Sequence, residues 1–312
     1  MKIAQLLAAL CFCNFLQASD LISALREGNQ LVIRAGSQEV LRYQAEPAEL
    51  PRPEIPKPFI RGGYIQSIRT PSGRLITDDF PANHLHHHGV WSAWTKTEFE
   101  GRNPDFWNMG DVTGSVEFVA LDSVWQKDGE AGFQARHRFI DLTAKPSISA
   151  LLETWEVRVS KADGNFLIDI TTTQLCAGPS PLKLPEYRYG GFGFRGSKEW
   201  NNRDKPGFLT ASGLTDRDKV NTSREKWCWL GGLVDGETCG VTILCHPGNF
   251  RFPQPIRAHP DEPFFCYSPP QLGDMEIVPN QPYVSRYRLV IADGKPDAKT
   301  AEEWWQQYAK IR

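Results

Sequence analysis

Short stretches in which apolar and polar residues alternate recur along the chain and predict β-strands. In residues 165–175, Phe166, Ile168 and Ile170 alternate with Leu167, Asp169 and Thr171, the two-residue period of a strand with one buried face. Similar segments, separated by Gly, Asp or Pro, are expected at 31–34, 39–43, 114–125, 132–143, 150–160, 226–234 and 239–246, and residues 277–291 are expected to form a last hairpin-like pair. Regularly spaced short strands favour a mainly β fold, a large antiparallel β-sandwich.

The end of the chain has a different period. In residues 300–311, Trp304, Trp305 and Tyr308 recur at helical spacing among Ala, Glu and Gln, which predicts a short amphipathic C-terminal helix docked on the sandwich. We expect these aromatic rings to pack rather than to contact a ligand. Since no repeat or low-complexity run interrupts residues 19–312, a single domain is expected there.

Residues 1–18 are typical of a signal peptide. Lys2 precedes an apolar run from Ile3 to Phe15, and Ala18 supplies a small residue for cleavage. The apolar run is short for a membrane span. We therefore expect export to a periplasm or to the extracellular space, with no membrane attachment after the signal is removed.

Five cysteines follow the signal, so at least one thiol is unpaired. Residues 226–234 and 239–246 resemble a hairpin around Asp235-Gly236-Glu237-Thr238. If Val234 faced Cys239, Cys228 would face Cys245. The two sulfurs would then either form a disulfide or pack as two small thiols.

The stretch from Asp78 to Asp111 concentrates candidate chemistry. It contains four of the seven histidines, followed by aromatic residues and carboxylates: His84, His86, His87, His88, Trp91, Trp94, Glu98, Asp105, Trp107 and Asp111. Imidazole is well suited to metal binding and to proton transfer near neutral pH. This stretch is therefore the main candidate site.

Three interpretations of the histidines remain open from their spacing. On an extended backbone, His84, His86 and His88 share one face and would suit a divalent metal, with a carboxylate such as Asp78, Asp79, Glu98 or Asp111 completing the shell. Alternatively, one histidine acts as acid or base without a metal. In the third interpretation the stretch is a hydrogen-bonded loop without chemistry.

Other candidates lie later in the chain. The segment Gly190-Gly191-Phe192-Gly193-Phe194-Arg195 has two interpretations. It is either a strand where backbone must approach closely, with Arg195 and Glu186 directed at a pocket, or a strand bend relieved by glycine, with a surface arginine. His246 begins a polar segment, held by three prolines, that also contains Asn249 and Arg251. His246 is either a second histidine near the site or a structural histidine whose hydrogen bonds are satisfied, and we expect His137 and His259 to be surface or packing residues.

Composition limits the partners. The chain has 312 residues, is 40% hydrophobic and 23% charged, and has a formal net charge of −2. It can bury a sizeable core. A near-neutral charge gives no reason to expect a nucleic acid or an anionic membrane as partner, so a small molecule or glycan is the expected ligand.

Several separated motifs resemble the secreted PmoA-like family of unknown function, whose members are often labelled methane oxygenase PmoA. They are RTPSG at 69–73, HHHGVWSAWTKTEFEGRNPDFWNMGD at 86–111, GGFGFR at 190–195 and DGETCGVTILCHPGNFRFPQP at 235–255. The resemblance spans residues 55–294. Commoner members have Arg where this chain has His88. The label implies an integral-membrane methane monooxygenase, and because no membrane span follows the signal, we do not expect that activity.

The resemblance implies a supersandwich like that of sugar epimerases and polysaccharide lyases, and so a carbohydrate-active enzyme of epimerase, lyase or hydrolase type. In this interpretation His87 or His88 acts as acid or base, Asp111 or Glu98 partners it, and Arg195 with His246 stabilises negative charge. The expected substrate-binding residues are Arg69, Trp91, Trp94, Trp107, Glu186, Asn249 and Arg251. A non-catalytic sugar-binding module would use the same aromatic rings, and a metal-dependent enzyme would use His84, His86 and His88.

Overall fold

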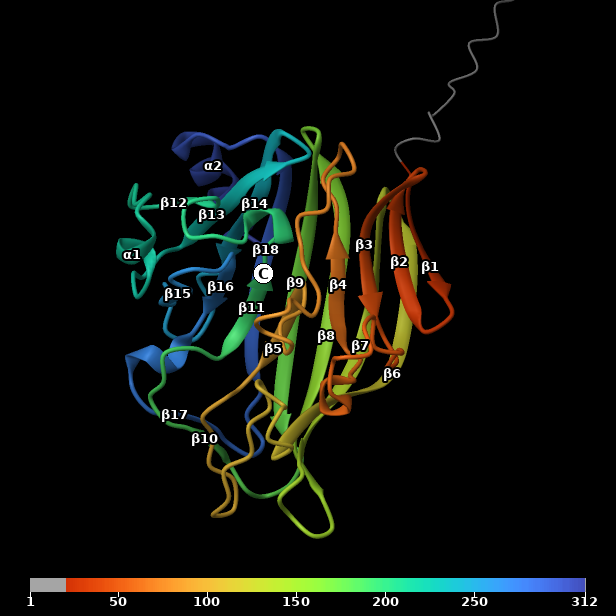
Figure 1. Cartoon of the computed structure of the whole chain (residues 1–312), viewed down its shortest axis with the longest axis vertical. Coiled ribbons are helices and arrows are strands. Elements are labelled where there is room, and N and C mark those ends of the chain that lie inside the picture. The colour runs from red at the N-terminus through yellow and green to blue at the C-terminus, as the bar shows by residue number, and fades with distance from the viewer. Residues whose placement is uncertain (1–20, 312) are drawn as a thin grey trace, which may run out of the picture.

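Two antiparallel eight-stranded sheets pack face to face in the computed structural model, which describes residues 21–311 (Figure 1). The first sheet contains, in spatial order, β1 (Ile22–Glu27), β2 (Gln30–Ala35), β3 (Gln38–Gln44), β4 (Tyr64–Ile68), β5 (Val90–Ala93), β11 (Gly191–Arg195), β16 (Phe264–Tyr267) and β15 (Ile256–Ala258). The second contains β12 (Gly207–Thr210), β13 (Trp227–Val234), β14 (Glu237–Cys245), β18 (Tyr283–Asp293), β9 (Asn165–Cys176), β8 (Ile148–Ala162), β7 (Glu130–Asp141) and β6 (Gly114–Lys127).

The remaining elements are short. The strands β10 (Leu182–Leu184) and β17 (Met275–Ile277) form a separate two-stranded sheet. The α-helices are α1 (Arg217–Val220) and α2 (Ala298–Tyr308), and 3-10 helices occupy Lys57–Phe59, Lys198–Trp200 and Pro269–Leu272. No helix among the described residues is both long and apolar enough to span a membrane. The signal peptide expected at 1–18 lies outside the described residues.

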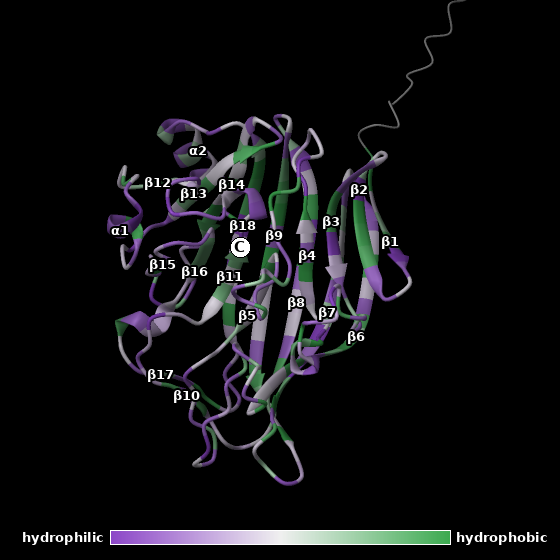
Figure 2. Cartoon of the chain, viewed as in Figure 1, coloured by the Kyte–Doolittle hydropathy of each residue, from purple (hydrophilic) through white to green (hydrophobic). Residues whose placement is uncertain are grey.

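The apolar residues that alternate in the sequence are buried on one face of their strands, and the predicted sandwich is confirmed. In β9, Phe166, Ile168 and Ile170 are buried in the core, whereas Leu167 and Asp169 are only partly buried on the other face. Figure 2 shows apolar and polar bands alternating along the long strands. The core between the sheets draws on both of them and includes Val90, Phe194, Trp155, Ile168 and Leu289. This burial is the main force that holds the sheets together.

The predicted C-terminal helix is also confirmed. Asp297 caps α2 by accepting a hydrogen bond from the Thr300 amide. Its buried residues Ala301 and Tyr308 pack on Trp227, Leu244 and Val290 of the second sheet. The helix therefore covers part of the outer face of that sheet, as its amphipathic pattern requires.

Two predicted hairpin details are wrong. The turn between β13 and β14 is the two residues Asp235-Gly236, both with positive φ, so Val234 pairs with Glu237 and Cys228 pairs with Ile243. The Cys228–Cys245 disulfide is absent, and the five cysteines within residues 21–311 are free thiols. Residues 277–291 are not a hairpin either, because β17 pairs with β10 while β18 lies between β14 and β9.

A chain of buried hydrogen bonds links the two sheets. The Tyr43 hydroxyl of β3 lies 2.6 Å from His137 Nε2 of β7, and His137 Nδ1 lies 2.9 Å from Glu153 Oε2 of β8. Gln174 Nε2 of β9 donates to Glu153 Oε1 at 2.7 Å, and Trp94 Nε1, just after β5, donates to Gln174 Oε1 at 2.8 Å. His137, expected to be a surface or packing residue, is thus a buried structural residue, and Trp94 belongs to the same network.

An aromatic cluster lies on the outer face of the first sheet. Trp91 of β5 and Phe264 of β16 lie there with Trp107. Between them runs Gly193 of β11, at which a Cβ atom would lie 2.9 Å from Trp107 Cη2 and 3.1 Å from the Trp91 ring. The expected close approach at this glycine strand is therefore present, and it is made by indole rings.

We predict that Gly193→Ala destabilises the protein by about 1–3 kcal/mol, because both indole rings are fully buried and a methyl group there overpacks the cluster. The matched control is Gly178→Ala, where a Cβ meets nothing within 4 Å. Urea unfolding of the two variants measures the difference. Equal midpoints for Gly193→Ala and the unsubstituted protein would contradict the close approach.

Candidate functional site

The histidine segment is a pair of tight turns, not the extended backbone on which the metal interpretation depended. The His84 amide donates to Pro81 O and the His87 amide donates to His84 O, both at 2.9 Å. The Phe80 amide then donates to His87 O at 3.0 Å and closes the loop. A turn places residues three apart on the same side, whereas a strand would place alternate residues there. The turns therefore decide which imidazoles meet.

The rings of His84, His86 and His87 gather on one side. His84 and His87 stack with centroids 4.7 Å apart and an interplanar angle of 8°, and His87 in turn stacks on Phe264 at 4.7 Å. His86 meets His87 edge-on at 4.6 Å. A fourth imidazole, His259, lies 5.2 Å from His84. Four histidines from two distant parts of the sequence thus form one cluster.

His88 is directed elsewhere. Its Nδ1 is 2.6 Å from Asp79 Oδ1, and its ring stacks on Tyr64 at 3.8 Å. The proposed metal face of His84, His86 and His88 is therefore not assembled. In residues 21–311, no three His, Cys, Asp or Glu side chains are placed to hold a metal ion.

The four clustered histidines line a cavity of 420 Å³, called here the histidine cavity. This volume is in the range of small-molecule sites, about 300–1,000 Å³. Its lining residues are His84, His86, His87, His259, Asn108, Arg188, Tyr189, Arg257, Pro260, Asp261 and Phe264. The cavity thus combines neutral and cationic hydrogen-bonding groups with two aromatic rings.

The aromatic side of the cavity is held by a second loop. Asp105 Oδ1 accepts hydrogen bonds from the amides of Trp107 and Asn108, which forms a turn there. The Tyr189 hydroxyl donates to Asn108 Oδ1 at 3.2 Å. Trp107 lies under this loop and contacts both Trp91 and Tyr189. Trp91 and Trp107 are fully buried, so they form the floor beneath the lining rather than its surface.

Arg195 anchors the histidine turn from below. It is fully buried, and its Nη2 donates to Asn201 Oδ1 at 2.6 Å and to Glu262 Oε2 at 2.7 Å. The other carboxylate oxygen of Glu262 accepts from the side chain of Asn83, next to His84. Arg195 is thus close to the cluster, as expected, but its guanidinium does not line the cavity.

Burial keeps the imidazoles neutral. Desolvation, with His84, His88 and Arg195 adding positive charge, lowers the pKa of His86 to about 3. Desolvation and the neighbouring His84 and Arg257 lower the pKa of His259 to about 4. The His259 Nδ1 accepts hydrogen bonds from the amides of Asp261 and Glu262, so the proton of the neutral ring resides on Nε2.

Most of the other candidate residues lie outside the cavity. His246 bonds through Nε2 to Ile311 O and contacts Tyr308 of α2. Asn249 and Arg251 bond to backbone carbonyls of neighbouring segments. Glu98 pairs with Lys183, and Asp111 lies in an exposed turn. The expected gathering of Asp111 and His246 with the histidine cluster does not occur.

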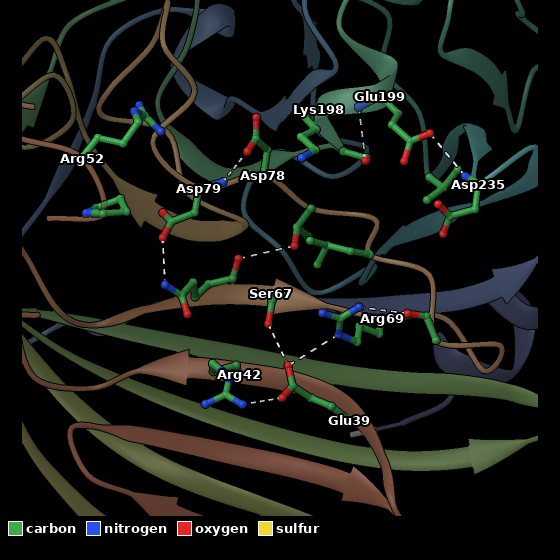
Figure 3. A pocket seen from close by; sticks show the side chains of 17 residues that line it. Glu39, Arg42, Arg52, Ser67, Arg69, Asp78, Asp79, Lys198, Glu199 and Asp235 are labelled. Carbon is green, nitrogen blue, oxygen red and sulfur yellow. Dashed lines mark hydrogen bonds and ion pairs between the residues drawn. The ribbon is translucent and has the colours of Figure 1, made fainter. Parts of the chain in front are cut away.

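The structure also has a separate mixed-charge cleft of 610 Å³ (Figure 3). Asp78, Asp79, Arg69 and Lys198 are among its lining residues. Asp79 bonds to Gln66 as well as to His88, and burial raises the pKa of Asp78. Arg69 is bound to Gly73 O and faces Glu39. Arg69 thus belongs to this cleft and not to the histidine cavity.

Several lining residues were not predicted as site residues. His259 was expected to be a surface or packing residue, and Tyr189, Phe264, Arg188 and Arg257 were not considered. One signal was present in the sequence. Arg257 and His259 alternate with the apolar residues Ile256 and Ala258, which are buried in the structure. This alternation predicts that both side chains point away from the core.

The fold and site define an antiparallel two-sheet β-sandwich with a histidine-lined cavity outside its first sheet. The chain belongs to the family of unknown function DUF6807, whose model matches residues 30–306. The further link to PmoA-like proteins stays a prediction. No curated protein matches the chain.

Solved structures share only distant likeness. A galactose mutarotase-like protein from Clostridium acetobutylicum has 12% identity and a TM-score of 0.45, covering 88% of this chain and 99% of that one. Heparan sulfate lyase HepC from Pedobacter heparinus has 8% identity and a TM-score of 0.33, covering 89% of this chain. The GH36 α-galactosidase AgaB from Geobacillus stearothermophilus has 11% identity and a TM-score of 0.33, covering 86%. The chain spans only 36% of the lyase and 39% of the galactosidase.

We predict that stability falls as the pH drops from about 7 to about 4. The pKa values of His86 and His259 are below the ordinary 6.5 in the folded state, so in this window the unfolded chain binds more protons. Stability is therefore full above pH 6.5 and is lost toward the folded pKa values. His86→Gln and His259→Gln should each flatten the dependence, measured by urea unfolding at several pH values. Imidazole NMR signals of these two residues that titrate near 6.5 would contradict this.

Proposed function

We propose that the histidine cavity binds a saccharide. The observation that carries the proposal is the joining of four neutral imidazoles with Asn108, Tyr189 and Phe264 around one cavity of 420 Å³. A neutral imidazole offers one N–H donor and one acceptor nitrogen, which matches the donor and acceptor character of a hydroxyl group. A sugar presents many such hydroxyls on a ring that also has apolar faces.

Unsatisfied polar atoms support this proposal. The Nδ1 atoms of His84 and His87 are buried and have no hydrogen-bond partner within the described residues. A buried polar atom without a partner costs about 1–3 kcal/mol. A ligand hydroxyl that reached either nitrogen would remove that cost, and the aromatic rings of Phe264 and Tyr189 would contact the apolar part of the ring.

We expect His86→Ala and His259→Ala each to weaken saccharide binding about fivefold, since each removes one hydrogen-bonding group worth about 1 kcal/mol. Ligand-observed NMR with a panel of mono- and disaccharides, including keto-sugars, identifies a binder. Titration calorimetry then compares the variants.

His246→Ala is the matched control, because His246 contacts α2 and does not line the cavity. It should bind as the unsubstituted protein does. Equal affinity in all three variants would place the saccharide elsewhere, and the absence of any binder in the panel would overturn the proposal.

A second candidate function, acid–base catalysis on the bound sugar, is favoured by the surroundings of His84. Burial and Arg195 lower its pKa, but the Glu262 carboxylate acts in the opposite direction. Glu262 is also close to His259, but the pKa values of His86 and His259 are lowered further, to about 3 and about 4. His84 is therefore the clustered histidine best placed to accept a proton and return it. In this proposal the residue that transfers the proton is His84, in place of the His87 or His88 expected from the sequence.

For catalysis by His84, we predict that His84→Gln lowers turnover by about 100-fold or more while binding changes by less than about tenfold. Product analysis by NMR measures turnover of the saccharide that binds. The rate should rise with pH through a pKa below 6.5 as His84 loses its proton, and this dependence should vanish in His84→Gln. Undiminished turnover in His84→Gln would exclude the role, and binding without turnover in either protein would identify a binding module.

A further inference from the structure

A second cavity adjoins the histidine cavity. It has a volume of 570 Å³, and Tyr187, Asn221 and Gln271 are among its lining residues. Arg188 and Arg257 line both cavities. Because the same two side chains form part of each wall, the two cavities are neighbours with these arginines at their junction, and the pair of cavities is called here the groove.

Neither guanidinium at this junction is neutralised by the protein. Arg257 Nη1 donates to the amide oxygen of Asn221 at 3.2 Å. The Arg188 guanidinium lies over the rings of Tyr187 and Tyr189, at 5.8 and 5.6 Å from their centroids. Within residues 21–311, neither side chain forms an ion pair with a carboxylate. This contrasts with Arg195, which is bound to Glu262.

The two arginines also repel one another. Burial is the main cause that lowers the pKa of Arg257, and the charge of Arg188 is the next. Arg257 is held on the short strand β15, between the buried residues Ile256 and Ala258, so it cannot easily move away. An anion between two guanidiniums would offset this repulsion and could accept paired N–H donors from either.

The carboxylates that line the groove do not supply that anion. Glu186, a predicted substrate-binding residue, is exposed in the second cavity and its amide donates to Asp274. Asp261 lines the histidine cavity, and its amide donates to His259 Nδ1. Neither acidic side chain is paired with Arg188 or Arg257. The junction therefore stays cationic.

We infer that the groove recognises an acidic saccharide of two or more rings, one of which carries a carboxylate or sulfate group bound between Arg188 and Arg257. One ring lies in the histidine cavity and the chain of rings continues into the second cavity. Each cavity has the volume of a small-molecule site, so one ring fills only part of the groove. The inference rests on the proposed function and names its substrate class.

The test compares a neutral disaccharide with the same disaccharide carrying a uronate carboxylate and with its sulfated form, by calorimetry on the full chain. We expect the acidic forms to bind about tenfold tighter at low ionic strength, with the preference falling as salt is added. The uronate and the sulfated form distinguish which anion the arginines select. Arg188→Gln and Arg257→Gln should each reduce the preference, measured against the affinity of the same variant for the neutral disaccharide, to less than about threefold.

The charge control is Arg138→Gln, which removes one positive charge at an exposed site on the second sheet, paired with Glu117. It should keep the full preference. Since Arg188 is exposed, its variant should fold even where Arg257→Gln does not.

Three results would overturn the inference, and they are distinguishable. Equal affinities for neutral and acidic forms would overturn it and leave the proposed function standing. A preference that survives both arginine substitutions would also overturn it, by excluding this junction. Failure of every disaccharide to bind would overturn the proposed function and the inference with it.

Discussion

The hydrogen-bond chain through the sandwich interior determines how the two sheets meet. The Trp94 indole N–H can only donate a hydrogen bond, and this fixes the direction of the chain at Gln174. Gln174 must therefore turn its oxygen to Trp94 and its nitrogen to Glu153. A shift of either sheet by one residue would leave these buried groups unpaired, at a cost of about 1–3 kcal/mol each. Hydrophobic packing holds the two sheets together, and this chain of hydrogen bonds selects their position relative to each other.

The same network reaches the candidate site through one short strand. Trp94 directly follows β5, and Trp91 of that strand lies beneath His87 and beside Trp107. The floor of the cavity is therefore part of the rigid sandwich, whereas its walls are turns that bring His84, His86 and His87 over it. Rigid strands below and loops above are a common arrangement for a binding site, because the loops can vary without loss of the core.

The sequence predicted the features that depend on local periodicity and missed those that depend on turns. The alternation in β9 and the helical spacing in α2 were sufficient to assign both, because their buried faces follow from a fixed period. The extended interpretation of residues 84–88 failed, since Pro81 and Asn83 favour turns and a turn groups side chains differently. His259 could not be joined to the cluster from the sequence, because it lies 175 positions after His84 and their contact depends on the path of the whole intervening chain.

The distribution of charge follows one rule across the histidine turns and the groove. His84, His86 and His87 are close to the guanidinium of Arg195, whereas His259 is close to that of Arg257. Each added proton would place another positive charge in a region of low dielectric constant, so the rings stay neutral. The positive charge that remains is concentrated on arginines, which do not lose their protons near neutral pH. A groove of this kind offers neutral hydrogen-bonding groups at one end and permanent cations at the junction, and a ligand with both hydroxyl and anionic groups complements both parts.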